Sequence, residues 1–138
     1  MKMMLKSINE NVLKSILVVF NDTIYHPGVD ITFNPSLHNR TDLKVYSPVS
    51  GKVERSIGTA GVWSEFAVRS VDGFSHIFLN FNQMILKPNA TVKVGHLIGR
   101  WGGKNAPQIG NYVHGHYQIR NRRGVLIDPV SYYNDRCS

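Results

Sequence analysis

Two short clusters of potential metal ligands stand far apart in this chain. The first is a pentapeptide that begins at His26 and ends at Asp30, and the second is formed by His114 and His116. Together they offer three histidines and one carboxylate. A catalytic zinc site takes three protein ligands of these types and keeps a further position for water. Because most of the chain separates the clusters, only the fold can unite them, and a chain that does so is expected to be a metal-dependent hydrolase.

The residues around the second cluster are typical of a β-strand. Residues 112–119 are rich in β-branched and aromatic side chains, and residues two apart in a strand point to the same face. The imidazoles of His114 and His116 are therefore expected side by side, about 7 Å apart at the backbone. One can ligate a metal while its neighbour addresses the bound water. Gly115 takes the opposite face, which predicts a close approach of another element there.

The spacing of the first cluster predicts a bend. A helix would bring His26 and Asp30 onto one face, but the intervening Pro27-Gly28 disfavours a helix. A fully extended strand would hold the two residues about 13 Å apart, too far for one ion. We therefore expect a turn at Pro27-Gly28 that leads into a strand over residues 29–33 and aims both side chains inward.

The other histidines differ in their surroundings. His76 lies among apolar residues in a predicted strand, which favours burial or a pocket wall over free exposure. His38 lies in a polar loop and His96 follows a glycine in a turn, and neither is given a role. A lone histidine beside a strand is more often a satisfied polar residue than a ligand. Both clusters with a third strand histidine, in one small β-rich domain, form a more specific signal.

The elements that must position these residues are mainly strands. The length of 138 residues and the composition, 42% hydrophobic and 18% charged, fit one globular domain. Apolar residues at three- and four-residue steps predict an amphipathic helix over residues 4–15, with residues 17–20 as a candidate strand. An Asp72-Gly73 pair predicts a hairpin, and the pattern as a whole predicts an all-β sandwich or barrel. The further predicted strands are 43–46, 51–57, 62–70, 74–81, 97–101 and 112–119.

The charge and the cysteine content limit which partners and which kinds of metal site the sequence supports. The formal charge of +7 suits attraction to nucleic acid, an anionic membrane surface or an acidic cell wall, or serves solubility alone. The basic residues are dispersed except for Arg120, Arg122 and Arg123, and no nucleic-acid partner is expected. Cys137 is the only cysteine, which excludes an internal disulfide and a thiolate zinc site. We expect neither a signal peptide nor a transmembrane segment.

Five segments, in order along residues 24–133, resemble the motifs of the M23 metallopeptidases, the lysostaphin- and LytM-like peptidoglycan endopeptidases. The family's first motif is His-x-Gly-x-Asp-Ile, which residues 26–31 match. The other matching segments are 45–53 (Val-Tyr-Ser-Pro-Val-Ser-Gly-Lys-Val), 74–77 (Phe-Ser-His-Ile), 92–99 (Val-Lys-Val-Gly-His-Leu-Ile-Gly) and 114–116 with the terminal Asp-Pro-Val of 128–130.

The resemblance implies a site and a fold. His26, Asp30 and His116 would hold Zn²⁺, and His76 and His114 would be the catalytic pair. The implied fold is mainly β, an antiparallel β-sheet groove or sandwich of the LytM-like, barrel-sandwich hybrid type with a short N-terminal helix. Residues 1–22 would form the helix and lead-in, and residues 23–138 the peptidase-like domain.

The implied function is a zinc metalloendopeptidase that hydrolyses a peptide bond in the stem or cross-bridge of peptidoglycan. It would act outside the cytoplasm, in the periplasm, at the cell surface or on a virion, and a phage origin would suit its small size. Its substrate would be a peptidoglycan peptide, with anionic wall polymers as a compatible partner, and it would be a monomer. Alternatives are a non-catalytic wall-binding or regulatory LytM-like domain, a phosphocarrier module and a basic nucleic-acid-binding domain.

Two departures from the family pattern bear on the substrate. Gly115 stands where the family usually has leucine, and the approach to this motif, residues 102–111, lacks the usual Ser/Thr-Gly-rich sequence. Because this approach would help to form the groove, the sequence leaves open which peptide bond is cleaved, Gly-Gly or D-Ala-diaminopimelate.

Overall fold

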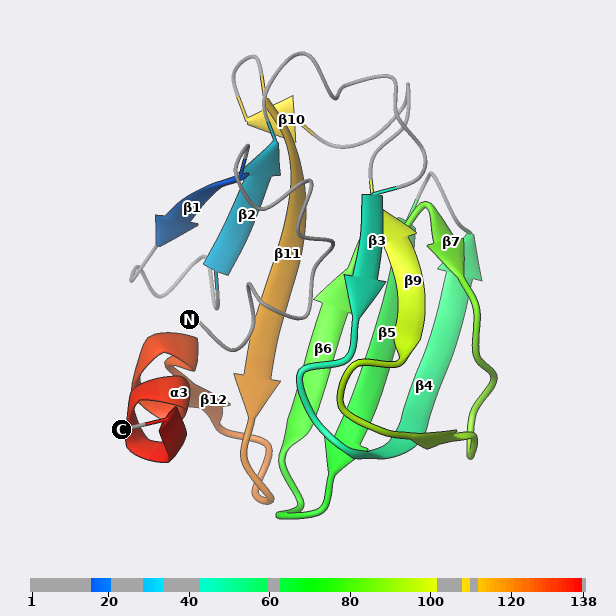
Figure 1. The fold of residues 1–138 in the computed structure, drawn as a ribbon, viewed down its shortest axis with the longest axis vertical. Coiled ribbons are helices and arrows are strands. Elements are labelled where there is room, and N and C mark those ends of the chain that lie inside the picture. Colours follow the sequence, from blue (N-terminus) through cyan, green and yellow to red (C-terminus); the bar gives the residue numbers. More distant parts are fainter. Residues whose placement is uncertain are drawn as a thin grey trace.

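The computed structural model describes residues 16–20, 29–33, 43–59, 63–101, 108–109 and 112–137. Over these ranges the protein is mainly β and ends in a short helix (Figure 1). The helix is α3 (Pro129–Cys137). The strands are β1 (Ile16–Phe20), β2 (Val29–Phe33), β3 (Leu43–Tyr46), β4 (Gly51–Thr59), β5 (Trp63–Ser70), β6 (Ser75–Leu79), β7 (Gln83–Met84), β8 (Thr91–Val92), β9 (Leu97–Trp101), β10 (Gln108–Ile109), β11 (Tyr112–Arg120) and β12 (Leu126–Ile127).

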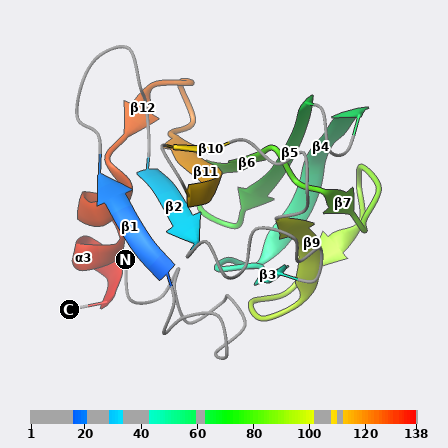
Figure 2. The same ribbon diagram turned by 90° about the horizontal axis from the view of Figure 1, so that it is seen from above.

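The strands form two antiparallel sheets. The larger sheet has the order β1-β2-β11-β6-β5-β4-β8, and β10 and β12 also pair with β11. The smaller sheet has the order β3-β9-β7 and lies across the face of β4 and β5 (Figures 1 and 2). Neither sheet closes into a barrel in the part of the chain that is described. Strand β11 pairs with β2, β6, β10 and β12, so it connects strands from the start, the middle and the end of the chain.

The hydrophobic core fills the space between the two sheets. Phe78 and Tyr117 come from the larger sheet, Trp101 comes from the smaller one, and all three are fully buried. The ring centroids of Phe78 and Tyr117 lie 4.9 Å apart, and those of Phe81 and Trp101 lie 5.4 Å apart. Such offset and tilted contacts are the preferred geometry of aromatic pairs and add to the hydrophobic gain. The core therefore fixes which face of β11 points inward.

Gly115 lies on that inward face, directly beneath an aromatic ring. A Cβ at this position would lie 2.3 Å from Cε2 of Trp101, far inside van der Waals contact. The expected close approach at Gly115 is confirmed. The position must stay without a side chain because the Trp101 indole, whose Nε1 donates to the carbonyl of Leu79 at 3.1 Å, occupies the space.

Most predicted strands are confirmed, three of them with the predicted bounds: 29–33, 43–46 and 97–101. The Asp72-Gly73 hairpin joins β5 and β6, and Gly73 takes a φ of 86° there. His96 lies in a turn, as expected. The helix predicted over 4–15, His38 and most of the loop 102–111 lie outside the described residues. Within the described part, no helix is both long and apolar enough to cross a membrane.

Helix α3 was not predicted. Its start carries recognisable signals, because Asp128 precedes a proline at the first helical position. The Asp128 carbonyl accepts from the Tyr132 amide at 3.0 Å, and its carboxylate accepts from Ser131 Oγ at 3.2 Å. The helix packs Tyr132 and Tyr133 into the core. Only nine residues long, it has a weak apolar period, which explains why the sequence pattern did not reveal it.

Candidate metal centre

The pairing of β2 with β11 brings residues from the two sequence clusters together. Asp30 is directly opposite His116, and Thr32 is directly opposite His114. Directly opposed residues of an antiparallel pair lie on the same face, and so do residues two apart in one strand. Asp30, His114 and His116 therefore lie on one face of the larger sheet. His26 lies outside the described residues, and within the described ranges no group of three or more ligand side chains is already gathered.

The side chain of His116 is buried and held by a neighbour. It is 7% exposed, and its Nε2 lies 3.0 Å from Oε1 of Gln118, which is equally buried. An amide oxygen can only accept, so Nε2 is the donor in this contact, and in the neutral ring the lone pair is then on Nδ1. Histidine, with an aspartate at the opposed position of the adjacent strand, is a pair of residue types that zinc takes as ligands. In residue type, Asp30 and His116 suit the metal that the sequence implies.

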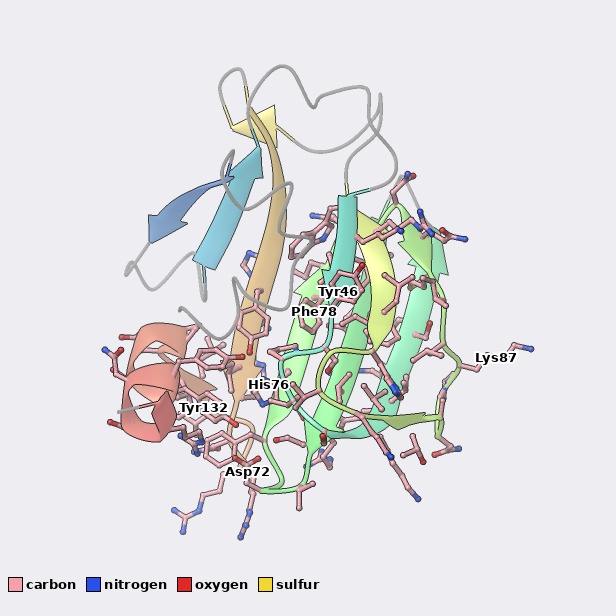
Figure 3. The ribbon with its side chains drawn as sticks, in the orientation of Figure 1. Tyr46, Asp72, His76, Phe78, Lys87 and Tyr132 are labelled. Atoms are coloured by element: carbon pink, nitrogen blue, oxygen red, sulfur yellow. The ribbon has the colours of Figure 1, made fainter. Side chains whose placement is uncertain are left out.

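His76 lies on the other face of the sheet. Its cross-strand partner in β11 is Ile119, a fully buried core residue, whereas the partner of His116 in β6 is Leu79. His76 is itself fully buried, and its Nδ1 lies 2.6 Å from the hydroxyl of Tyr117. Figure 3 shows it between the sheet and Tyr132 of α3. The structure therefore brings His76 together with core tyrosines and not with His114 and His116.

The surroundings of His76 keep its ring neutral. Burial lowers its pKa from 6.5 to about 4, the nearby Asp72 carboxylate opposes this, and Arg136 adds to it. The hydroxyl of Tyr117 also contacts that of Tyr133 at 2.5 Å, and burial raises the pKa of both phenols. A neutral imidazole linked to two neutral phenols joins β6, β11 and α3. This arrangement suits a structural role.

The face that carries His116 continues across the sheet through Leu79 to Glu65 of β5. Glu65 forms an ion pair with Arg55, with Oε2 and Nε 3.2 Å apart. Asn80 follows Leu79 with a φ of 66°, a left-handed conformation that asparagine tolerates. Because His76 is the one histidine of β6 and lies on the core face, β6 brings no histidine to the side of the sheet on which His116 lies.

Two residues of this face, Gln118 and Glu65, do not belong to the clusters predicted from the sequence. Gln118 follows His116 by two residues, so strand alternation alone could have placed it beside the imidazole. Glu65 could not be found in this way, because its position opposite Leu79 depends on the pairing of β5 with β6.

Comparison with known proteins defines the fold. Neither a protein-family model nor a curated protein matches the sequence. Solved structures do match it. Lysostaphin from Staphylococcus simulans, an antimicrobial peptidase, aligns with a TM-score of 0.66 and 19% identity over 87% of this chain and 50% of its own. A chain of the SpoIIIAH–SpoIIQ complex aligns with a TM-score of 0.62 and 23% identity, over 90% of this chain and 83% of its own.

A zinc-containing peptidase from Vibrio cholerae also aligns, with a TM-score of 0.56 and 20% identity over 74% of this chain and 28% of its own. This chain therefore spans half of the lysostaphin chain and about a quarter of the Vibrio peptidase. At these identities the likeness concerns the fold. The protein has the LytM-like fold of the M23 peptidases, which is found both in peptidases and in the SpoIIIAH–SpoIIQ complex.

Proposed function

We propose that this protein is a zinc-dependent endopeptidase that hydrolyses a peptide bond in the stem peptide or cross-bridge of bacterial peptidoglycan. The observation that carries the proposal is the register that sets Asp30 directly opposite His116, with His114 on the same face. Residues that are far apart in sequence and suited to zinc thus meet on one sheet face. A LytM-like fold, shared with the peptidase lysostaphin, supports the same interpretation.

Each residue of this face has a proposed role. His26, Asp30 and His116 would hold Zn²⁺, which when bound polarises the scissile carbonyl and lowers the pKa of a water molecule. His114, two residues before His116, would accept a proton from the attacking water and return it to the leaving amine. Imidazole suits this exchange because it titrates near neutral pH.

The proposal gives His76 a structural role in place of the catalytic one that the family resemblance implied. A general base must reach the proton that it removes, directly or through one water. His76 faces the core and is bonded to Tyr117. Of the two histidines expected to transfer protons, His114 is the one whose strand position suits the site.

The substrate and location follow from the same proposal. Peptidoglycan lies outside the cytoplasm, so the protein would act there, on the wall or from a virion. The net charge of +7 would attract the protein to an anionic wall, and this attraction should weaken with added salt.

The test is the loss of turbidity of purified peptidoglycan treated with zinc-loaded protein. Lysis should disappear after chelation and in His114→Ala, and mass spectrometry of the products would identify the bond. His96→Ala is the matched control, because His96 is an exposed turn histidine that directly precedes β9 of the smaller sheet. Inert wild-type protein with about one zinc per chain, as a three-ligand site predicts, would reject the proposed activity.

A second candidate is a non-catalytic LytM-like domain that binds the wall or a protein partner. The observation in its favour is the position of His76, which leaves the site face with one of the two expected proton-transfer histidines. A similar fold in the SpoIIIAH–SpoIIQ complex is compatible with such a role. Sedimentation with peptidoglycan in the absence of any bond cleavage would support this candidate over the enzyme.

A further inference from the structure

Gln118 makes a specific contact with the proposed metal ligand His116. The two residues are two apart in β11, so they share the face on which Asp30 lies. Each is 7% exposed, and the Gln118 amide oxygen lies 3.0 Å from His116 Nε2. The cross-strand partner of Gln118 is Ile77, which is 1% exposed. A buried amide must be hydrogen-bonded, and the imidazole of His116 supplies a partner.

The chemistry of this contact determines the form of the imidazole. The amide oxygen accepts, so the Nε2–H of His116 donates to it. In a neutral imidazole the other nitrogen, Nδ1, then carries the lone pair that a metal requires. Histidines that bind metals usually donate their second ring N–H to an acceptor, which fixes both the tautomer and the ring orientation.

We propose that Gln118 is a positioning residue that holds His116 as its Nε2–H tautomer and so presents Nδ1 to the zinc. This inference rests on the proposed function and names a residue that the sequence motifs did not include. Gln118 acts through His116 and touches neither metal nor substrate. Its contribution should therefore appear in the tautomer and in metal affinity before it appears in turnover.

Two substitutions separate this role from simple packing. Gln118→Met keeps the length of the side chain and removes the acceptor, whereas Gln118→Glu keeps an acceptor at the same place. In the metal-free protein, ¹⁵N NMR of the imidazole should show Nε2–H in the wild type and in Gln118→Glu. Gln118→Met should shift His116 towards a mixture of tautomers.

Zinc affinity, measured by competition with a chromophoric chelator, is the second readout. Loss of an outer partner of a metal-bound histidine typically weakens metal binding by about 10- to 100-fold. We expect a loss of this size in Gln118→Met and a change of less than about threefold in Gln118→Glu. Thermal unfolding of the metal-free variants checks that both are folded at the temperature of the measurement.

Three results would overturn the inference: a wild-type His116 that carries its hydrogen on Nδ1, unchanged tautomer and affinity in Gln118→Met, or an equal loss in both variants. The first result is measured on the wild type, so this test can be made even if Gln118→Met does not fold. Failure of the proposed function looks different. A wild type that binds zinc, loses affinity only in Gln118→Met and cleaves nothing would keep the role of Gln118 and reject the peptidase. A wild type that binds no zinc would overturn both.

Discussion

His76 and His116 lie on opposite faces of one pair of antiparallel strands. His76 is opposite Ile119, and His116 is opposite Leu79, so an odd number of positions separates the two histidines along the β6–β11 ladder. Side chains alternate between faces with a period of two, and this parity puts one histidine in the core and the other on the proposed metal face. The two imidazoles therefore serve different parts of the molecule.

Substitution of these histidines should separate zinc binding from stability. His116→Ala should lose about one zinc per chain, because a three-ligand site loses a donor. His76→Phe should keep the zinc and any hydrolytic activity, since its ring lies on the core face. It should lower the free energy of unfolding by about 1–3 kcal/mol, because the buried Tyr117 hydroxyl loses a partner. Metal analysis and urea unfolding measure the two effects, and a folded, zinc-loaded His76→Phe without hydrolysis would restore His76 to catalysis.

Stability should fall in mild acid because His76 is buried as the neutral form. Its pKa is about 4 in the folded protein against 6.5 for an exposed histidine. Between these values the unfolded chain binds a proton that the folded one does not, so stability is complete above pH 6.5 and is lost as the pH falls towards 4. The loss reaches roughly 3 kcal/mol. The groups around the ring are Asp72, Tyr117, Tyr132 and Arg136, and Tyr133 contacts the hydroxyl of Tyr117.

The control for this pH effect is His76→Phe, which has no imidazole to protonate at this position. Its urea midpoint should change less between pH 7 and pH 5 than that of the wild type. The pKa of Asp72 is also perturbed: partial burial raises it, but hydrogen bonds from Ser70, the Phe74 amide and Tyr132 outweigh burial and hold it below its usual value. That carboxylate loses its contribution at lower pH, so equal slopes above pH 5 in both proteins would contradict the role given to His76.

The strand pattern and the ligand clusters could be predicted because they depend on local sequence. The alternation around His114 and His116 and the Pro27-Gly28 break before residues 29–33 predict strands, and those strands are present. The side on which His76 lies could not be predicted. It depends on the register of β6 against β11, and a shift of one residue would move it to the other face.

His76 and Gly115 show what a sequence motif can and cannot predict. The match of residues 74–77 to a family motif assigned His76 to the catalytic pair. The face of the sheet on which His76 lies is decided instead by its pairing with Ile119 and its contact with Tyr117, which lies 41 positions away in the sequence. Gly115 is the converse case. Its alternation with the histidines predicted a close approach, and the structure supplies the Trp101 ring that requires it.

Gly115→Ala should destabilise the protein although alanine is only one methyl group larger. The new Cβ would lie 2.3 Å from the fully buried Trp101, whose ring is wedged against Phe78 and Phe81. Overpacking of this kind typically costs about 1–3 kcal/mol. Thermal unfolding measures the loss, and Trp101→Phe in the same chain should recover part of it by making room. An unchanged melting temperature in Gly115→Ala would mean that the ring can move aside.

Asp72 should anchor α3 to the hairpin between β5 and β6. Its Oδ2 accepts from the Tyr132 hydroxyl at 3.0 Å and pairs with Arg136 at 3.3 Å, while its Oδ1 accepts from the amide of Phe74 at 3.2 Å (Figure 3). Asp72→Ala should lower the free energy of unfolding by about 1–2 kcal/mol, the cost of hydrogen bonds to a partly exposed charged group.

A double-mutant cycle with Tyr132→Phe tests whether this contact with the helix is responsible for the loss. Tyr132→Phe removes the hydroxyl that Asp72 accepts from. It keeps the ring, which packs at a tilt against Phe74 and whose centroid lies 3.6 Å from the Arg136 guanidinium carbon. Residues in contact typically show coupling of about 0.5 kcal/mol or more, so the double variant should lose less than the sum of the single losses. Additive losses, measured by urea unfolding at pH 7, would show that the bond to the Tyr132 hydroxyl does not account for the effect of Asp72, which would then come from the hairpin turn or from the pair with Arg136.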